Sequence, residues 1–222
     1  MSEQIAVIDL EAEAELPIWS INNFLENVSS NYLKLVSLRE ICTRFAAGAH
    51  DREFVIAARS FDLFPEGRQL SYDESSLVRL ESKERSPKRF WQLFKHLQRP
   101  IVLFEHDAEV SPIFDIHSDH ALRIKKLSLD SPWSFSFQGT VGALVDLFTG
   151  RLLAQRENER ISLALQNVRQ AVETSHLIES PETPPGVRQY AIEQLEFIMN
   201  KQDRINQKLG IRPDDLRFGS HR

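Results

Sequence analysis

The spacing of the apolar residues changes near Gly139, and this change constrains the fold more than any other feature of the chain. Before it, short apolar runs end at turn residues, which is typical of strands mixed with helices. After it, apolar residues recur every three or four positions over about seventy residues, which is typical of helix. The sequence therefore predicts an α+β fold, with a small mixed α/β N-terminal domain (residues 1–138) and a helical C-terminal domain (residues 139–222).

The N-terminal domain is expected to combine strands with amphipathic helices. Residues 5–15 alternate apolar and charged side chains, which predicts a strand with one buried face. Ser20 can cap a helix, and a further helical stretch ends near Gly48, where glycine supplies a left-handed backbone. Ser86 and Pro87 open another helix with an apolar stripe. Apolar runs at 77–80, 101–104, 110–116, 122–129 and 135–137 predict strands, whereas residues 54–64 fit either strand or helix.

The C-terminal domain is predicted to be a long antiparallel helical hairpin, similar to a coiled coil, with a short C-terminal tail. The proline-rich break at residues 181–186 separates its two arms, and Gln202 interrupts the apolar spacing of the second arm. Spacings of three and four residues place apolar side chains on one face of each arm. This seam is either an intramolecular core or a surface for another helix. The seam residues are Ile161, Leu165, Val168, Val172, Leu195, Ile198 and Ile205.

The seam makes a non-enzymatic interaction or regulatory protein the leading functional hypothesis. Such a protein would form a homo-oligomer, as a dimer, or bind a helical protein partner, and we expect no cofactor. Residues 139–142 place two glycines at a strand-to-helix junction but lack the lysine and third glycine of phosphate-binding loops. Close packing of a helix on a strand is the preferred interpretation of that junction.

Composition indicates a folded chain. Hydrophobic residues make up 41% and charged residues 27%, which excludes wholesale disorder. The single cysteine, Cys42, cannot form an internal disulfide and is expected to be a buried small hydrophobic residue. No run of apolar residues is long enough to span a membrane, and the N-terminus lacks the features of a secretory signal. We therefore expect a cytoplasmic protein without a membrane partner.

A metal-dependent hydrolase is the alternative hypothesis. Asp115, His117, Asp119 and His120 lie close together in the sequence, one residue away from the His-x-His-x-Asp-His motif of the metallo-β-lactamase fold. Imidazole and carboxylate ligands could hold zinc or manganese and activate a bound water. The chain has only 8 glycines, whereas that fold surrounds its metals with glycine-rich loops. The other interpretation is a polar loop between two strands.

Nucleic-acid binding through the basic helix 86–99 is a second alternative. Basic side chains beside aromatic ones could contact phosphates and stack on bases. The acidic pI of about 5.8 and the need to bury the apolar stripe of this helix argue against that function. The candidate contacts are Lys88, Arg89, Trp91 and Lys95.

The C-terminal part resembles a recurrent pattern in uncharacterised bacterial proteins. The pattern is a strand ending at Ser131-Pro132, then Gly139 and an amphipathic helix, within residues 122–147. An arginine- and glutamate-rich helix and a second helix follow in those proteins, similar to residues 156–170 and 189–209 here. The resemblance covers about the last hundred residues, and Trp133 stands where those proteins usually have glycine. It implies a bacterial cytosolic protein with a C-terminal helical hairpin, and it implies no activity.

Overall fold

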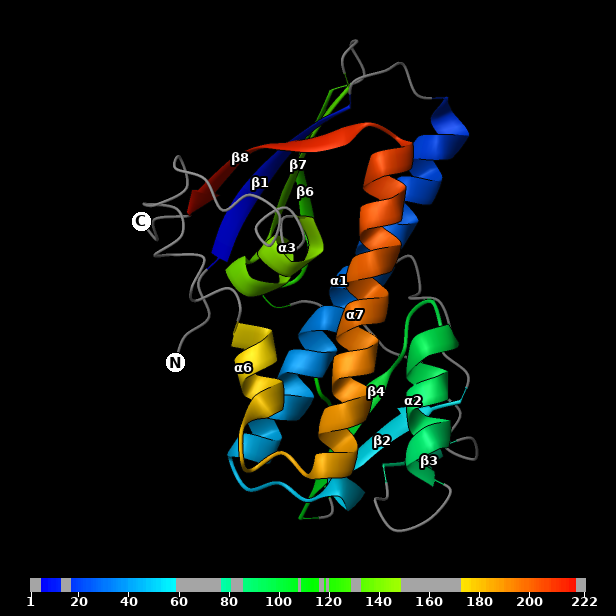
Figure 1. Ribbon diagram of the computed structural model, residues 1–222, viewed down its shortest axis with the longest axis vertical. Helices are drawn as coiled ribbons and strands as arrows, with labels where there is room; N and C mark the ends of the chain where they lie inside the picture. The colour runs from blue at the N-terminus through cyan, green and yellow to red at the C-terminus, as the bar shows by residue number, and fades with distance from the viewer. Residues whose placement is uncertain are drawn as a thin grey trace. The chain divides into compact units, whose positions relative to one another are not determined.

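The computed structural model describes residues 5–12, 17–58, 77–80, 86–107, 109–115, 118, 120–128, 133–148 and 173–218. These residues form an α+β fold with antiparallel sheets and several helices, which confirms the predicted class (Figure 1).

Contacts group the chain into two compact units. Unit 1 comprises Met1–Tyr32, Ser118–Glu173 and Phe197–Arg222, and unit 2 comprises Leu33–His117 and Thr174–Glu196. Helices α1 (Ile18–Ala46) and α7 (Pro185–Lys208) contribute residues to both units. Each unit therefore draws residues from both sides of the predicted boundary between residues 138 and 139.

The sheet of unit 1 has four antiparallel strands in the order β6-β7-β1-β8. They are β6 (Arg123–Ser128), β7 (Ser134–Thr140), β1 (Ile5–Ala12) and β8 (Ile211–Phe218). Every second residue of β1 is buried, from Ala6 to Ala12, which confirms the predicted strand with one buried face.

Two helices of unit 1 pack on the apolar face of this sheet. The ring of Phe24 in α1 lies with its centroid 5.2 Å from that of Phe135 and 6.2 Å from that of Phe137. Helix α3 (Val141–Phe148) follows β7 directly, and Phe148 stacks on Phe137 with a centroid separation of 6.0 Å. Figure 1 shows the four strands side by side with α3 against them. The aromatic residues of β7 thus form the centre of the core of unit 1.

Strand β8 is a correction to the predicted C-terminal tail. Its residues pair with β1 from Ala12 opposite Ile211 to Ala6 opposite Phe218. The register shifts between Asp9 and Leu10, next to the position that faces Pro213. A proline cannot donate a ladder hydrogen bond and is tolerated only at a sheet edge or a bulge. Because of this proline, the strand could not be predicted from its sequence pattern. Its pairing with β1, rather than local alternation, defines it.

Helix α1 joins the two helical stretches that the sequence indicated into one element. No proline or glycine occurs between its first and last residues. The helix ends at Ala46, and Gly48 adopts a φ of 92°, which confirms its predicted role at the C-terminus of the helix.

The sheet of unit 2 has four antiparallel strands in the order β3-β2-β4-β5. The ring of Phe45 in α1 lies 4.7 Å, centroid to centroid, from that of Phe54, and Phe54 lies 5.3 Å from Phe104 on the next strand. The ambiguous segment that starts at Phe54 is thus a strand over its first four residues, and helix α2 is present as predicted. The bounds are β2 (Phe54–Ala57), β3 (Leu77–Arg79), α2 (Ser86–His96), β4 (Val102–His106) and β5 (Glu109–Pro112), with a short 3-10 helix, η1, at Asp51–Glu53.

Helix α7 covers most of the range predicted for the second arm, and a turn joins it to α6 (Glu173–Glu179). The Thr183 hydroxyl donates to the Leu177 carbonyl at 3.2 Å, and the Arg188 guanidinium donates to the Ser180 carbonyl at 2.9 Å. These bonds satisfy carbonyl groups at the end of α6. Residues 149–172, which would complete the first arm, lie outside the described residues.

Candidate interaction surface

Where the predicted seam is described, the chain itself buries two of its three residues. Leu195 and Ile198 are buried, and Ile205 is half-buried. The Asn31 amide of α1 donates to the Gln202 carbonyl oxygen at 2.9 Å, so the residue that interrupts the apolar spacing of α7 has a polar partner within unit 1. The other four seam residues, Ile161, Leu165, Val168 and Val172, lie outside the described residues.

The residues of the metal hypothesis are described only in part. Asp115 is exposed and belongs to unit 2, whereas His120 is half-buried and belongs to unit 1. The His120 carbonyl accepts a hydrogen bond from the Tyr32 hydroxyl at 2.5 Å. The Nδ1 atom of His120 is buried and has no hydrogen-bond partner among the described residues. His117 and Asp119 lie outside the described residues. Within the described part of the chain, no group of three or more potential ligands could hold a metal ion.

The basic helix α2 presents cations but not its tryptophan. Lys88 and Arg89 are exposed and Lys95 is half-buried. Trp91, however, is only 1% exposed, and its ring stacks on Tyr190 with a centroid separation of 6.4 Å. A ring in that position cannot stack on a base, so Trp91 has to be removed from the candidate nucleic-acid contacts. Trp91 belongs to the apolar stripe of α2, which is wide enough to include it beside Phe90 and Phe94.

Strand β6 carries an exposed surface that the sequence analysis did not single out. Ile124 is 51% exposed and Leu127 is 41% exposed, although both are large apolar residues. Arg123, Lys125 and Lys126 are exposed on the same strand, which contains no acidic residue. The strand therefore combines two apolar and three basic side chains along one edge of the sheet.

A β-bulge explains this arrangement. Ile124 pairs with Phe137 and Leu127 pairs with Phe135, while the register shifts between Ile124 and Lys126. Directly paired residues share one face of a sheet. The extra residue, Lys125, therefore puts two apolar side chains that are three positions apart on the face of the buried phenylalanines. Simple alternation would have separated them, which is why pattern analysis missed this surface.

The other edge strands of the two sheets are less suited to pairing with a partner strand. Strand β5 exposes Val110, at 46%, but it has only 4 residues and ends at Pro112. Strand β3 has 3 residues, and β8 contains Pro213. Proline and short length are devices that blunt sheet edges. Strand β6 has 6 residues and no proline, so each of its residues has a backbone N–H that could pair with a partner strand.

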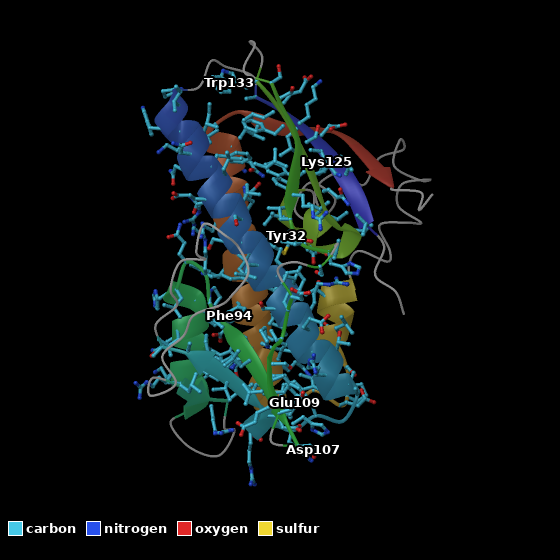
Figure 2. The ribbon with its side chains drawn as sticks, turned by 180° about the vertical axis from the view of Figure 1, so that it is seen from behind. Tyr32, Phe94, Asp107, Glu109, Lys125 and Trp133 are labelled. Atoms are coloured by element: carbon cyan, nitrogen blue, oxygen red, sulfur yellow. The ribbon has the colours of Figure 1, made fainter. Side chains whose placement is uncertain are left out.

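The position of β6 in unit 1 is visible in Figure 2, which marks Lys125 on the strand and Trp133 where β7 begins. Trp133 is half-buried, and its carbonyl accepts a hydrogen bond from the Ala12 N–H at 2.9 Å. This bond ties the loop end of the β6–β7 hairpin to β1. The edge is thus held by a hairpin that is anchored in the sheet.

Unit 2 contains a cluster of polar side chains near the β4–β5 turn, where Figure 2 marks Asp107 and Glu109. The Glu53 carboxylate accepts the His50 N–H at 2.6 Å and lies 2.5 Å from Nδ1 of His106. The bond from His50, followed by that from His106, lowers the pKa of Glu53 below its usual value. The bond from Glu53, followed by the charge of Asp107, raises the pKa of His106. When His106 is protonated, the contact between Glu53 and His106 is an ion pair that joins η1 to β4.

Cys42 is buried in α1, as expected. Burial raises the pKa of its thiol to about 12, against a smaller opposing effect of Arg39. A protonated, buried thiol is neither a nucleophile nor a metal ligand.

No protein-family model matches the chain, and no curated protein or solved structure is significantly similar to it. None of the helices in the described residues is both long and apolar enough to cross a membrane.

Proposed function

We propose that this chain is a non-enzymatic interaction protein that binds a partner protein through strand β6. The observation that carries the proposal is the exposure of Ile124 and Leu127 beside the buried core aromatic residues of the same sheet face. Covering them would remove apolar surface from water at a gain of about 25 cal/mol per Å². A partner that lies along the edge of the sheet would cover both side chains at once.

The basic residues of β6 support the same proposal. Within the described part of the chain, no carboxylate forms an ion pair with Lys125 or Lys126. Charges at the rim of an interface contribute to partner selection and association rate more than to affinity. The strand therefore supplies both the apolar contact and the charge that a selective interface requires.

Self-association through the predicted helical hairpin remains a second proposal. The observation that favours it is the turn between α6 and α7, which Arg188 and Thr183 hold together. Leu195 and Ile198 are buried, so this proposal depends on the predicted seam positions Ile161, Leu165, Val168 and Val172, which lie outside the described residues. Light scattering of Leu165→Asp with Val172→Asp tests this proposal: loss of a dimer supports it, and a wild-type chain that is already monomeric contradicts it.

The test of the main proposal uses three forms of the full chain: wild type, Ile124→Asp with Leu127→Asp, and Val110→Asp. Val110 is the matched control, because it is an apolar residue of similar exposure on the edge strand β5. Circular dichroism first establishes that all three forms are folded. Each then serves as bait in an extract of the cells from which the gene comes. A partner held by wild type and Val110→Asp but lost from the β6 variant is the expected result.

Equal capture by all three forms contradicts binding through β6, and so does a folded wild-type chain that captures nothing. A photo-reactive amino acid placed at position 125 adds a positional readout. It should cross-link to the captured partner, whereas the same group at position 110 should not.

A further inference from the structure

We propose that the partner contributes an extended acidic segment that pairs with β6 as an additional strand of the unit 1 sheet. This inference rests on the proposed function and specifies the chemistry of the partner. It follows from the backbone of the edge strand, from the sign of its charges and from the exclusion of a second copy.

The backbone of β6 can bind a strand on its outer side. In an antiparallel ladder, residues alternate between those that bond to the neighbouring strand and those whose N–H and C=O groups point away from it. Strand β6 has β7 on one side, and within the described residues no strand pairs on its other side. An edge of this kind is the site that extended peptides use when they add a strand to a sheet.

The charges of β6 specify an acidic segment. Arg123, Lys125 and Lys126 are all exposed, and no acidic residue lies between Arg123 and Ser128. Opposite charges that face each other across neighbouring strands are stabilising, and like charges are destabilising. A segment that alternates acidic with apolar residues would place carboxylates near the lysines and apolar side chains beside Ile124 and Leu127.

The same charges disfavour a second copy of β6 as the partner. Pairing β6 with itself would bring three cations of one copy against three identical cations of the other. Like-charge contact costs affinity and thereby selects against the wrong partner. A different chain, with an acidic strand, is the occupant that the surface fits.

Lysines and a bulge are also the devices that protect an edge strand from aggregation. Protection alone, however, does not account for Ile124 and Leu127, because polar residues at these positions would protect the edge better. The lysines therefore provide selectivity against neutral and basic strands, while Ile124 and Leu127 contribute affinity for an acidic strand.

The experiment uses the full chain and synthetic peptides of about seven residues, the length of an ordinary strand. The first peptide alternates glutamate with valine, and the second alternates lysine with valine. The third has the sequence of the first but carries N-methyl groups on alternate residues, so that it keeps the charge and loses the N–H donors of one edge. Fluorescence anisotropy of labelled peptides gives the affinities. The glutamate–valine peptide should bind at least about tenfold more tightly than either control.

A charge-reversed chain, Lys125→Glu with Lys126→Glu, provides the reciprocal test. Both side chains are exposed, so the substitutions leave the core intact. This chain should lose affinity for the glutamate–valine peptide and gain affinity for the lysine–valine peptide. Equal binding of the N-methylated peptide would overturn strand pairing, because only charge would then be recognised. Tighter binding of a single-stranded oligouridine than of any peptide would overturn the choice of a protein partner.

The two proposals can fail separately. If no peptide binds at concentrations up to about 1 mM, the acidic-strand inference is wrong. Capture of a partner that still depends on Ile124 and Leu127 would then leave binding through β6 standing. If capture does not depend on β6, the proposed function itself is wrong.

Discussion

The backbone N–H of Thr140 donates a hydrogen bond to the hydroxyl oxygen of Tyr32 at 2.7 Å. The same hydroxyl donates to the His120 carbonyl at 2.5 Å. The tyrosine ring lies so close to Gly139 that a β-carbon at this position would be 2.6 Å from the hydroxyl oxygen. Tyr32 therefore joins α1, the end of β7 and the segment before β6, and glycine at 139 leaves the space for it.

Tyr32→Phe should lower the free energy of unfolding by about 1–3 kcal/mol, because it leaves a buried N–H and a carbonyl without their partner. Urea denaturation followed by circular dichroism measures the change. Tyr190→Phe is the matched control, since Tyr190 is half-buried and contributes its ring to a stack on Trp91. The control should change stability by less than about 0.5 kcal/mol. Equal effects of the two substitutions would contradict the role assigned to the Tyr32 hydroxyl.

Asn31 and Gln202 should be energetically coupled. The two side chains are buried and hydrogen-bonded between α1 and α7 in unit 1. A double-mutant cycle with Asn31→Ala and Gln202→Ala should give a coupling energy of about 0.5–3 kcal/mol. The exposed pair Gln207 and Asp203, joined at 2.9 Å within α7, is the control, with an expected coupling below about 0.5 kcal/mol. A coupling near zero at the buried pair would show that Gln202 does not fix the position of α7 on α1.

Much of the fold could be predicted because many elements carry their own signal. Strand β1 alternates buried residues with half-buried or exposed ones, α1 contains no glycine or proline, and α2 begins at a serine followed by proline. Local pattern and tertiary burial agree in these segments. A segment with one buried face and clear end signals can therefore be predicted from its sequence.

The features that could not be predicted depend on distant residues. Strand β8 is defined by its pairing with β1 around Pro213. The polar side chain of Gln202 is buried because it bonds to Asn31, which is far away in the sequence. The bulge at Lys125 changes which face Leu127 occupies, so the candidate surface on β6 has no alternating pattern. The burial of Trp91 could have been predicted from the width of the apolar stripe on α2, because this pattern lies within the helix itself.

Cys42 should not react with thiol reagents in the folded chain. Its pKa is raised from 9.0 to about 12, so at pH 8 the thiolate fraction in the folded state is about 1,000-fold lower than in an unfolded chain. Alkylation by iodoacetamide, followed by mass spectrometry with and without urea, measures the two rates. The folded chain should be modified only at the rate at which it unfolds. Rapid modification without urea would contradict the burial of Cys42.

The ion pair between Glu53 and His106 should give stability a specific pH dependence. The pKa of His106 is raised, so its contribution is complete below about 6.5 and is lost as the pH rises through the folded value. The pKa of Glu53 is lowered, so its contribution is complete above about 4.5 and is lost as the pH falls through the folded value. The stability difference between wild type and Glu53→Gln should therefore be largest between these two pH values.

Titration of the histidine ring protons by NMR tests the same pair directly. Glu53→Gln should lower the pKa of His106 toward its usual value, while the other histidines serve as internal references. An unchanged His106 titration in this variant would show that Glu53 is not its partner in solution.

Hydrogen exchange of the β6 amides measures whether a partner binds along this strand. The full chain is compared alone and with its captured partner, with the glutamate–valine peptide as a substitute. Amides within Arg123–Ser128 should exchange more slowly in the complex, because new hydrogen bonds form at the outer edge of β6, while those of β5 should exchange as before. Slower exchange at β5, or no change at β6 in a complex that has formed, would contradict partner binding through this strand.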